Sequence, residues 1–307
     1  MIKLWQGSAN TWDCDEMGHM NVRVYVEKAM EGLARLAYEI DMPHAFREAS
    51  PSTLLPVDQH IRFLNEVHPG KPLSMSGCVV DMGAGDAVIY QDLRHADGTP
   101  AAAFRTRVQH ARSGSGEMFP WSRRTQAALE AQIDTPPADT APRSIQPDAP
   151  TQDTKEISLT AAKSSGAPRI GMGCVPPQHC DIHGRMQTQW FMGRISDSVP
   201  NLLSDWRARI AEEAGNKSAG AAVLEYRLIY HRWPRAGDAF DVYSSLAGAA
   251  EKTHSLVHWM VDPVSGLPWM TSKAVAATFD LKTRRIIPTQ PDHIDALRAL
   301  APGDLSI

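Results

Sequence analysis

A short motif occurs twice in this chain, and its repetition restricts the possible folds more than any other feature of the sequence. Residues 13–20 read DCDEMGHM, and residues 179–186 read HCDIHGRM. Cysteine, aspartate, glycine and methionine recur at one spacing, so that Asp181 follows Asp15 by 166 residues (181 − 15 = 166). Two copies of one structural unit are the simplest explanation.

Each copy of the motif leads into apolar residues at helical spacing, which predicts one long helix per copy. After the first motif, one helical face collects Val22, Val26, Ala29, Met30, Leu33, Leu36, Ala37 and Ile40. After the second, it collects Phe191, Ile195, Val199, Leu202, Trp206 and Ile210. Pro200 interrupts the second pattern, so we expect that helix to kink or restart there.

The similarity between the copies continues downstream in the same order. Gly237 follows Gly70 by 167 residues (237 − 70 = 167), and Gly266 follows Gly98 by 168 (266 − 98 = 168). Single-residue changes in loop length produce a slow drift of this kind, whereas chance matches would not keep their order. The chain is therefore a tandem duplication.

Apolar segments bounded by Gly, Pro and Asp follow each predicted helix and indicate antiparallel strands. The predicted strands are 60–64, 73–80, 87–93 and 101–108 in the first copy, and 223–230, 239–246, 255–261 and 269–279 in the second. A short opening strand is expected at 3–9 and at 170–175, and a short helix is expected to end each copy. The predicted unit is thus β-αββββ, an α+β fold.

The domain division follows from the repeat. We expect a first repeat at 1–133 and a second at 168–307. Between them, residues 134–167 are rich in Pro, Thr, Ala and Asp and poor in large apolar side chains. This composition predicts an extended or disordered linker.

Composition excludes several classes of function. The net charge of −4 argues against a nucleic-acid surface or a basic patch that binds membranes. Four cysteines in 307 residues do not suggest a disulfide framework. No signal peptide and no apolar run of about 18 residues is evident, so we expect a cytoplasmic protein.

The stretch Trp12–Val22, with Tyr25 following, resembles the hot-dog fold, and the resemblance spans both repeats. It is similar to acyl-CoA thioesterases of the 4-hydroxybenzoyl-CoA thioesterase type, which carry Asp-Cys-Asp-x-x-Gly before the helix. It is also similar to the plant acyl-carrier-protein thioesterases, which carry Asp-x-Asn-x-His-x-Asn-Asn. The resemblance implies a double hot-dog that hydrolyses an acyl-CoA or acyl-carrier-protein thioester without cofactor or metal, and that can form homo-oligomers through its sheets.

Elementary chemistry supports a site at the first motif. A carboxylate just before a helix can act as a base or nucleophile, while the N–H groups of the first helical turn face a carbonyl oxygen. The resemblance makes Asp15 the base or nucleophile, and His19 matches the plant histidine. It places the backbone N–H near Val22 on the carbonyl oxygen, with Asn21 and Tyr25 as substrate contacts.

The second motif differs from the first. Asp181 is retained as a candidate catalytic residue, but Arg185 stands where the first copy has His19. His183 occupies the position of the plant asparagine and is a candidate substrate contact. We therefore expect unequal half-sites, with Asp15 carrying more of the catalysis than Asp181.

Structural explanations for the same residues stay open at this point. Asp15 could serve only as a helix cap, and Asn21 could form an Asx turn. His19 could be an ordinary loop histidine. Cys14 and Cys180 are better explained as small buried residues than as nucleophiles.

Other functions also stay open. Cys174, His179, Cys180 and His183 could suggest zinc, but they lack the Cys-x-x-Cys spacing of structural sites. A hot-dog enoyl-thioester hydratase is an alternative enzyme, although the Asn-Pro-x-His-type signature of that group is missing. A catalytically silent protein that binds acyl thioesters is the non-enzymatic alternative.

Overall fold

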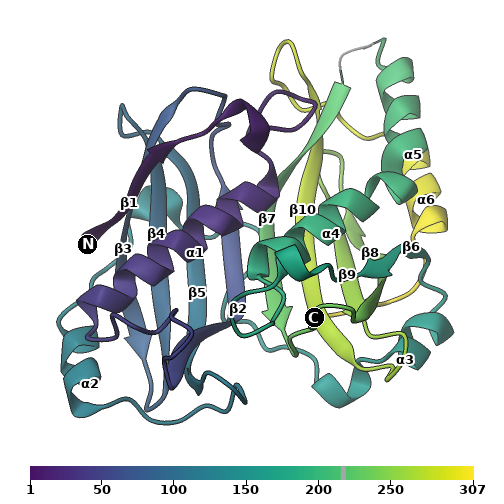
Figure 1. The fold of residues 1–307 in the computed structure, drawn as a ribbon. Coiled ribbons are helices and arrows are strands. Elements are labelled where there is room, and N and C mark those ends of the chain that lie inside the picture. The colour runs from purple at the N-terminus through teal and green to yellow at the C-terminus, as the bar shows by residue number, and fades with distance from the viewer. Residues whose placement is uncertain (216–218) are drawn as a thin grey trace. The chain divides into compact units, whose positions relative to one another are not determined.

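The computed structural model of the chain describes residues 1–215 and 219–307. Contacts between backbone atoms divide these residues into two compact units (Figure 1). None of the described helices is both long enough and apolar enough to cross a membrane.

The two units do not follow the simple order of the sequence. The first unit comprises Met1–Arg143 and also Cys180–Met192, which contains the second motif. The second unit comprises Ser144–His179 and Gly193–Ile307. The second motif therefore has its contacts within the first unit, although its helix continues into the second.

The first unit has one helix against an antiparallel sheet (Figure 1). Its elements are β1 (Ile2–Ser8), α1 (Val22–Glu39), β2 (Ser52–Phe63), β3 (Pro72–Met82), β4 (Asp86–His95), β5 (Pro100–Arg112) and α2 (Arg123–Glu130). The strands are ordered β1-β3-β4-β5-β2, and neighbouring strands are antiparallel.

The second unit repeats this plan. Its elements are β6 (Arg169–Cys174), α4 (Thr188–Ser198), α5 (Pro200–Glu213), β7 (Ala219–Tyr230), β8 (Ala239–Ala249), β9 (His254–Val261), β10 (Pro268–Asp280) and α6 (Pro291–Leu300). The strand order β6-β8-β9-β10-β7 matches that of the first unit position by position. The predicted β-αββββ repeat and its strands are confirmed.

The long helix differs between the units as the sequence predicted. α1 is continuous, whereas the second helical pattern divides into α4 and α5, with Pro200 as the first residue of α5. Proline has no N–H to donate and is accepted in a first helical turn. The break at Pro200 is therefore confirmed.

Glycines at equivalent positions of the two copies adopt a positive φ, which explains why they recur in the sequence. Gly70 and Gly237 have φ values of 77° and 92°, and Gly98 and Gly266 have 86° and 76°. Positive φ strains residues that carry a Cβ, so glycine is favoured at the same turns of both copies.

The expectation for residues 134–167 is wrong in their second half. Helix α3 (Leu159–Ser164) forms there, and the Ser158 hydroxyl accepts a hydrogen bond from the Ala161 N–H at 3.1 Å. Ile157 and Ala162 are buried in a cluster that includes Trp259. A few apolar side chains are enough to hold this segment on the outer face of the second unit's sheet.

The helix α1 lies very close to its sheet at Gly32. A Cβ at this position would be 2.6 Å from Nε2 of Gln91 and 2.6 Å from Sδ of Met75. The Gln91 amide needs this space because its Nε2 donates to the Ala29 carbonyl at 2.7 Å. Gly32 thus leaves room for the Gln91 side chain to hydrogen-bond to the helix.

We predict that Gly32→Ala lowers the free energy of unfolding by about 1–3 kcal/mol. The lost Gln91 hydrogen bond and the steric overlap outweigh the gain in helix propensity of about 1 kcal/mol. Urea denaturation measures the change, and Gly248→Ala is the control because nothing lies within 4 Å of its added Cβ. Unchanged stability of Gly32→Ala would contradict the close helix–sheet contact.

Candidate active site

The first motif forms a closed loop between β1 and α1. Cys14 and Met20 make a β-bridge across it. The Asp15 N–H donates to the His19 carbonyl at 3.0 Å, and the Gly18 N–H donates to the Asp15 carbonyl at 3.0 Å. Gly18 has a φ of 78°, which the turn requires and which a larger residue would resist.

Asp15 and His19 lie together in this loop. Oδ1 of Asp15 accepts the Met17 N–H at 3.0 Å, and Oδ2 lies 3.5 Å from Nδ1 of His19. The two side chains are 16% and 13% exposed, so the pair is shielded but reachable from solvent. Among the described residues, no group donates a hydrogen bond to Oδ2 of Asp15.

Asn21, and not Asp15, caps helix α1. Its Oδ1 accepts the Arg23 N–H at 2.9 Å, and its own N–H donates to the Asp13 carbonyl at 2.9 Å. The interpretation of Asp15 as a helix cap is therefore wrong, and the Asx-turn role of Asn21 is confirmed. A substrate contact by Asn21 stays a prediction.

Tyr25 is buried behind the motif. Its ring meets Phe63 edge-on with centroids 5.2 Å apart, and its hydroxyl is hydrogen-bonded to the Val67 backbone. Burial raises the pKa of Tyr25 well above its ordinary value, so the phenol is protonated at neutral pH. Its role as a substrate contact is untested.

The connection between β2 and β3 supports the loop from a second side. The Met20 N–H donates to the Val67 carbonyl at 2.7 Å, and Nδ1 of His68 donates to the Gly18 carbonyl at 3.0 Å. The sequence did not single out His68. Its place beside Gly70, a matched glycine of the repeat, was the signal that could have found it.

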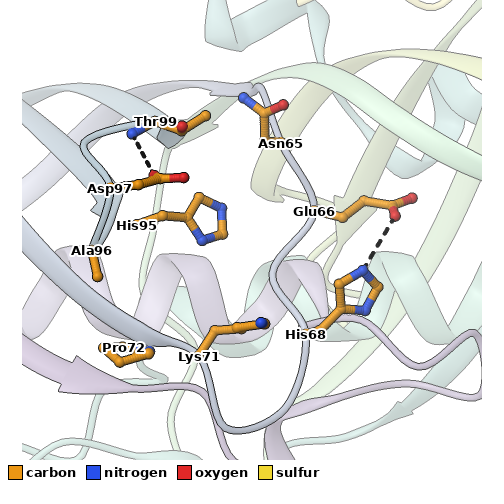
Figure 2. Close-up of a pocket in the computed structure, with 9 residues that line it drawn as sticks. All are labelled: Asn65, Glu66, His68, Lys71, Pro72, His95, Ala96, Asp97 and Thr99. Atoms are coloured by element: carbon orange, nitrogen blue, oxygen red, sulfur yellow. Dashed lines mark hydrogen bonds and ion pairs between the residues drawn. The ribbon is translucent and has the colours of Figure 1, made fainter.

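A pocket of about 450 Å³ opens beside this connection (Figure 2). It is lined by Asn65, Glu66, His68, Lys71, Pro72, His95, Ala96, Asp97 and Thr99. In Figure 2, Lys71 and His95 point into the hollow, while Glu66 and His68 approach each other at 3.8 Å. The walls carry both charge signs, so the pocket by itself does not define a ligand.

The second motif has the same backbone hydrogen bonds, but its carboxylate has different hydrogen-bond partners. The Asp181 N–H donates to the Arg185 carbonyl at 2.7 Å, and Gly184 has a φ of 77°. Oδ1 of Asp181 accepts the N–H groups of His183 at 2.8 Å and Arg185 at 2.9 Å. Oδ2 accepts Nε of Arg185 at 3.1 Å.

Arg185 holds the second motif in place. Its side chain is 7% exposed, and Nη1 donates to the Ser113 carbonyl at 3.3 Å. The guanidinium neutralises Asp181 through its Oδ2, while backbone N–H groups bind Oδ1, although the Asp181 side chain is still 32% exposed. The Asp181 carboxylate is therefore committed to structure, whereas Asp15 has only a histidine at the matching place.

Trp190, just after the second motif, contacts the start of α1. The Arg23 guanidinium lies over the Trp190 ring, 4.6 Å from its centroid, and also pairs with Glu27 at 2.9 Å. The second copy thus contributes an aromatic side chain to the first turn of the first helix.

The two motif cysteines, Cys14 and Cys180, have partly buried thiols. Cys14 is half-buried, and burial together with Asp13 and Asp15 raises the pKa of its thiol, which disfavours the nucleophilic thiolate. Its thiol donates to the Asn10 carbonyl at 3.4 Å. Cys180 is half-buried as well.

Among the described residues, one group of side chains could hold a metal ion: Glu213, Asp292 and His293. Arg209 already pairs with Glu213 at 2.8 Å and with Asp292 at 3.2 Å. This group does not include the zinc ligands considered from the sequence, Cys174, His179, Cys180 and His183.

We predict that Arg185→Met lowers the free energy of unfolding by about 1–3 kcal/mol, because it leaves Asp181 and the Ser113 carbonyl without their donor. The control is Arg124→Met, since Arg124 is 83% exposed and pairs with Asp41 at the surface. That change should cost less than about 1 kcal/mol. Equal effects in urea denaturation would refute a structural role for Arg185.

Comparison with known proteins supports the repeat and its fold. The family model of the thioesterase-like superfamily matches residues 9–129 and 175–297. No curated protein matches the chain significantly.

Solved structures are similar over both units. An acyl-ACP thioesterase from Bacteroides thetaiotaomicron matches with a TM-score of 0.63 and 12% identity, covering 89% of this chain and 96% of that one. The 12:0-ACP thioesterase from Umbellularia californica matches with a TM-score of 0.65 and 7% identity, covering 89% and 93%. At such identities the likeness shows the fold, a double hot-dog. With two family matches that together span most of its length, the chain belongs to the thioesterase-like superfamily.

Proposed function

We propose that this protein hydrolyses an acyl thioester, with Asp15 as the reacting carboxylate. The observation that carries the proposal is the contrast between the two motif aspartates. Asp181 is bonded through both oxygens to Arg185 or its neighbours, whereas Oδ2 of Asp15 lies 3.5 Å from His19 and has no other partner in the described part of the chain. An aspartate must have an accessible oxygen to take a proton from water or to attack a carbonyl.

In the simpler form of the mechanism, Asp15 acts as a general base. It takes a proton from water as the water oxygen attacks the thioester carbonyl. Collapse of the tetrahedral intermediate breaks the C–S bond, and the departing thiolate takes the proton back from Asp15. His19 orients the carboxylate, while the N–H near Val22 and the helix dipole of α1 stabilise the oxyanion.

The proposed substrate is an acyl-CoA or an acyl-carrier-protein thioester, and no metal or cofactor is required. Support comes from superfamily membership and from the matched structures, two of which are described as ACP thioesterases. Asn21, Tyr25 and His183 are proposed to contact the substrate. Assembly into homo-oligomers through the sheets belongs to the same proposal.

We predict that Asp15→Asn reduces turnover by about 10²–10⁴-fold, the usual loss for a general base, because an amide cannot accept the proton. Asp181→Asn should reduce turnover much less. The measurement is release of free thiol across a panel of acyl-CoA and acyl-carrier-protein substrates. This assay also separates hydrolysis from hydration, which releases no thiol.

The matched control is Glu16→Gln, since Glu16 is an exposed carboxylate of the same loop. It should retain wild-type turnover, and melting temperatures should show that all three variants are folded. Full activity in folded Asp15→Asn would reject the assignment. A larger loss in Asp181→Asn would move the chemistry to the second motif, and binding without thiol release by the wild type would favour the silent binding protein.

A further inference from the structure

The interior of the second unit contains a row of polar side chains that has no counterpart in the first unit. Ser244 of β8 pairs with His258 of β9, and His258 pairs with Ser272 of β10. Directly paired residues share a face of the sheet, so the three side chains stand side by side. All three are fully buried.

None of these three side chains is satisfied within the described part of the chain. The hydroxyls of Ser244 and Ser272 and both ring nitrogens of His258 lack a hydrogen-bond partner there. A buried polar atom without a partner costs about 1–3 kcal/mol. Several such atoms in one row therefore leave hydrogen-bonding capacity that the described part of the chain does not use.

The first unit provides an internal reference. Its corresponding row is Gly77, Gln91 and Phe104. Gln91 has the only polar side chain among these three residues. Its amide donates to the Ala29 carbonyl of the continuous helix α1. The second unit has no such arrangement, because its helix is interrupted at Pro200 and its row contains three polar side chains.

The polar row faces helix α5. Leu256, two residues before His258 on β9, lies in one cluster with Leu203, Trp206 and Ile210 of α5. Residues two apart on a strand point to the same side, so His258 points to the side of the sheet on which α5 packs. Trp206 also meets the ring of His254 edge-on at 5.2 Å, which brings a second histidine to this side.

Arg207 brings a positive charge to the same interior. It lies on α5 among the buried residues Leu203, Trp206 and Ile210, and its Nε is buried without a partner. No ion pair joins it to a carboxylate of the described residues. Burial lowers its pKa to about 10, so it is still charged at neutral pH, and its charge acts on Tyr226 and His254.

The other titratable groups of this cluster are neutral. Burial lowers the pKa of His254 to about 4 and that of His258 to about 3, and it raises that of Tyr226. Tyr226 stacks with His258 at 6.4 Å between ring centroids, which links Arg207 to the polar row. The cluster thus offers one cation and several hydrogen-bond donors, without an anion of its own.

We propose that the second unit binds a small carboxylate in its interior, between α5 and the sheet, with Arg207 as its counter-ion and Tyr226, His254, His258, Ser244 and Ser272 as hydrogen-bonding groups. Arg207 is half-buried and its Nε is buried without a partner. A cation in such a place is ordinarily paired, and a carboxylate supplies both the charge and the acceptors that this cluster lacks. The carboxylate can be a free small molecule or the far end of a dicarboxylic acyl group.

The test uses the full-length protein with acetate, butyrate and succinate at constant ionic strength, and butyramide as the uncharged probe. Binding is followed by the intrinsic tryptophan fluorescence, to which Trp206 beside His254 contributes, and by melting temperature. At least one carboxylate should give a saturable change in both, and butyramide should give none. If no carboxylate binds saturably to the wild type, the proposal is wrong.

Arg207→Met removes the charge and keeps a long apolar side chain. It should weaken carboxylate binding at least about tenfold. It should also raise the melting temperature of the ligand-free protein, because an unpaired half-buried charge is removed. The matched control is Arg209→Met on the same helix, whose side chain is 53% exposed and paired with Glu213. Equal binding by the two variants would overturn the proposal.

Two further arms identify the source of the carboxylate and separate this site from the proposed hydrolysis. If the carboxylate belongs to the acyl group, Arg207→Met raises KM for succinyl-CoA and leaves that for butyryl-CoA unchanged. If it is a free molecule, both KM values are unchanged while binding of the free carboxylate is lost. Asp15→Asn should retain carboxylate binding, so loss of hydrolysis and loss of this site are distinguishable.

Discussion

The short backbone ring that closes each motif is the constraint on which both loops depend. In the first copy the Asp15 N–H reaches the His19 carbonyl, and Gly18 supplies the positive φ that lets the chain turn back. The aspartate side chain then accepts an N–H two residues ahead, which holds the carboxylate at the loop rather than in solvent. Because this ring is made by backbone atoms, it survives changes of the side chains around it.

One side chain of that ring gives the aspartates of the two copies different electrostatic environments. The residue four positions after the aspartate is His19 in one loop and Arg185 in the other. Arginine is always charged and donates through several nitrogens, so it binds the carboxylate and the Ser113 carbonyl together. In the first loop, His19 lies 3.5 Å from the Asp15 carboxylate, so the same backbone surrounds the two aspartates with different partners.

The break in the second helix has a comparable effect on the interior. In the first unit, a continuous α1 passes close over Gln91 and satisfies its amide. In the second, α5 starts anew at Pro200 and carries Arg207, whose charge acts on Tyr226 and His254. The corresponding rows of the two units therefore differ: Gln91 is satisfied by α1, whereas Ser244, His258 and Ser272 have no partner among the described residues.

The sequence alone determined the duplication, the order of strands and helices, the restart at Pro200 and the motif glycines, because these follow from local spacing and backbone preference. It could not show that Asn21 takes the helix cap or that Ile157 packs beside Trp259. Nor could it show what surrounds His258. Those outcomes depend on residues distant in the chain. Tertiary structure alone decides which donors reach a carboxylate and which buried groups are left without a partner.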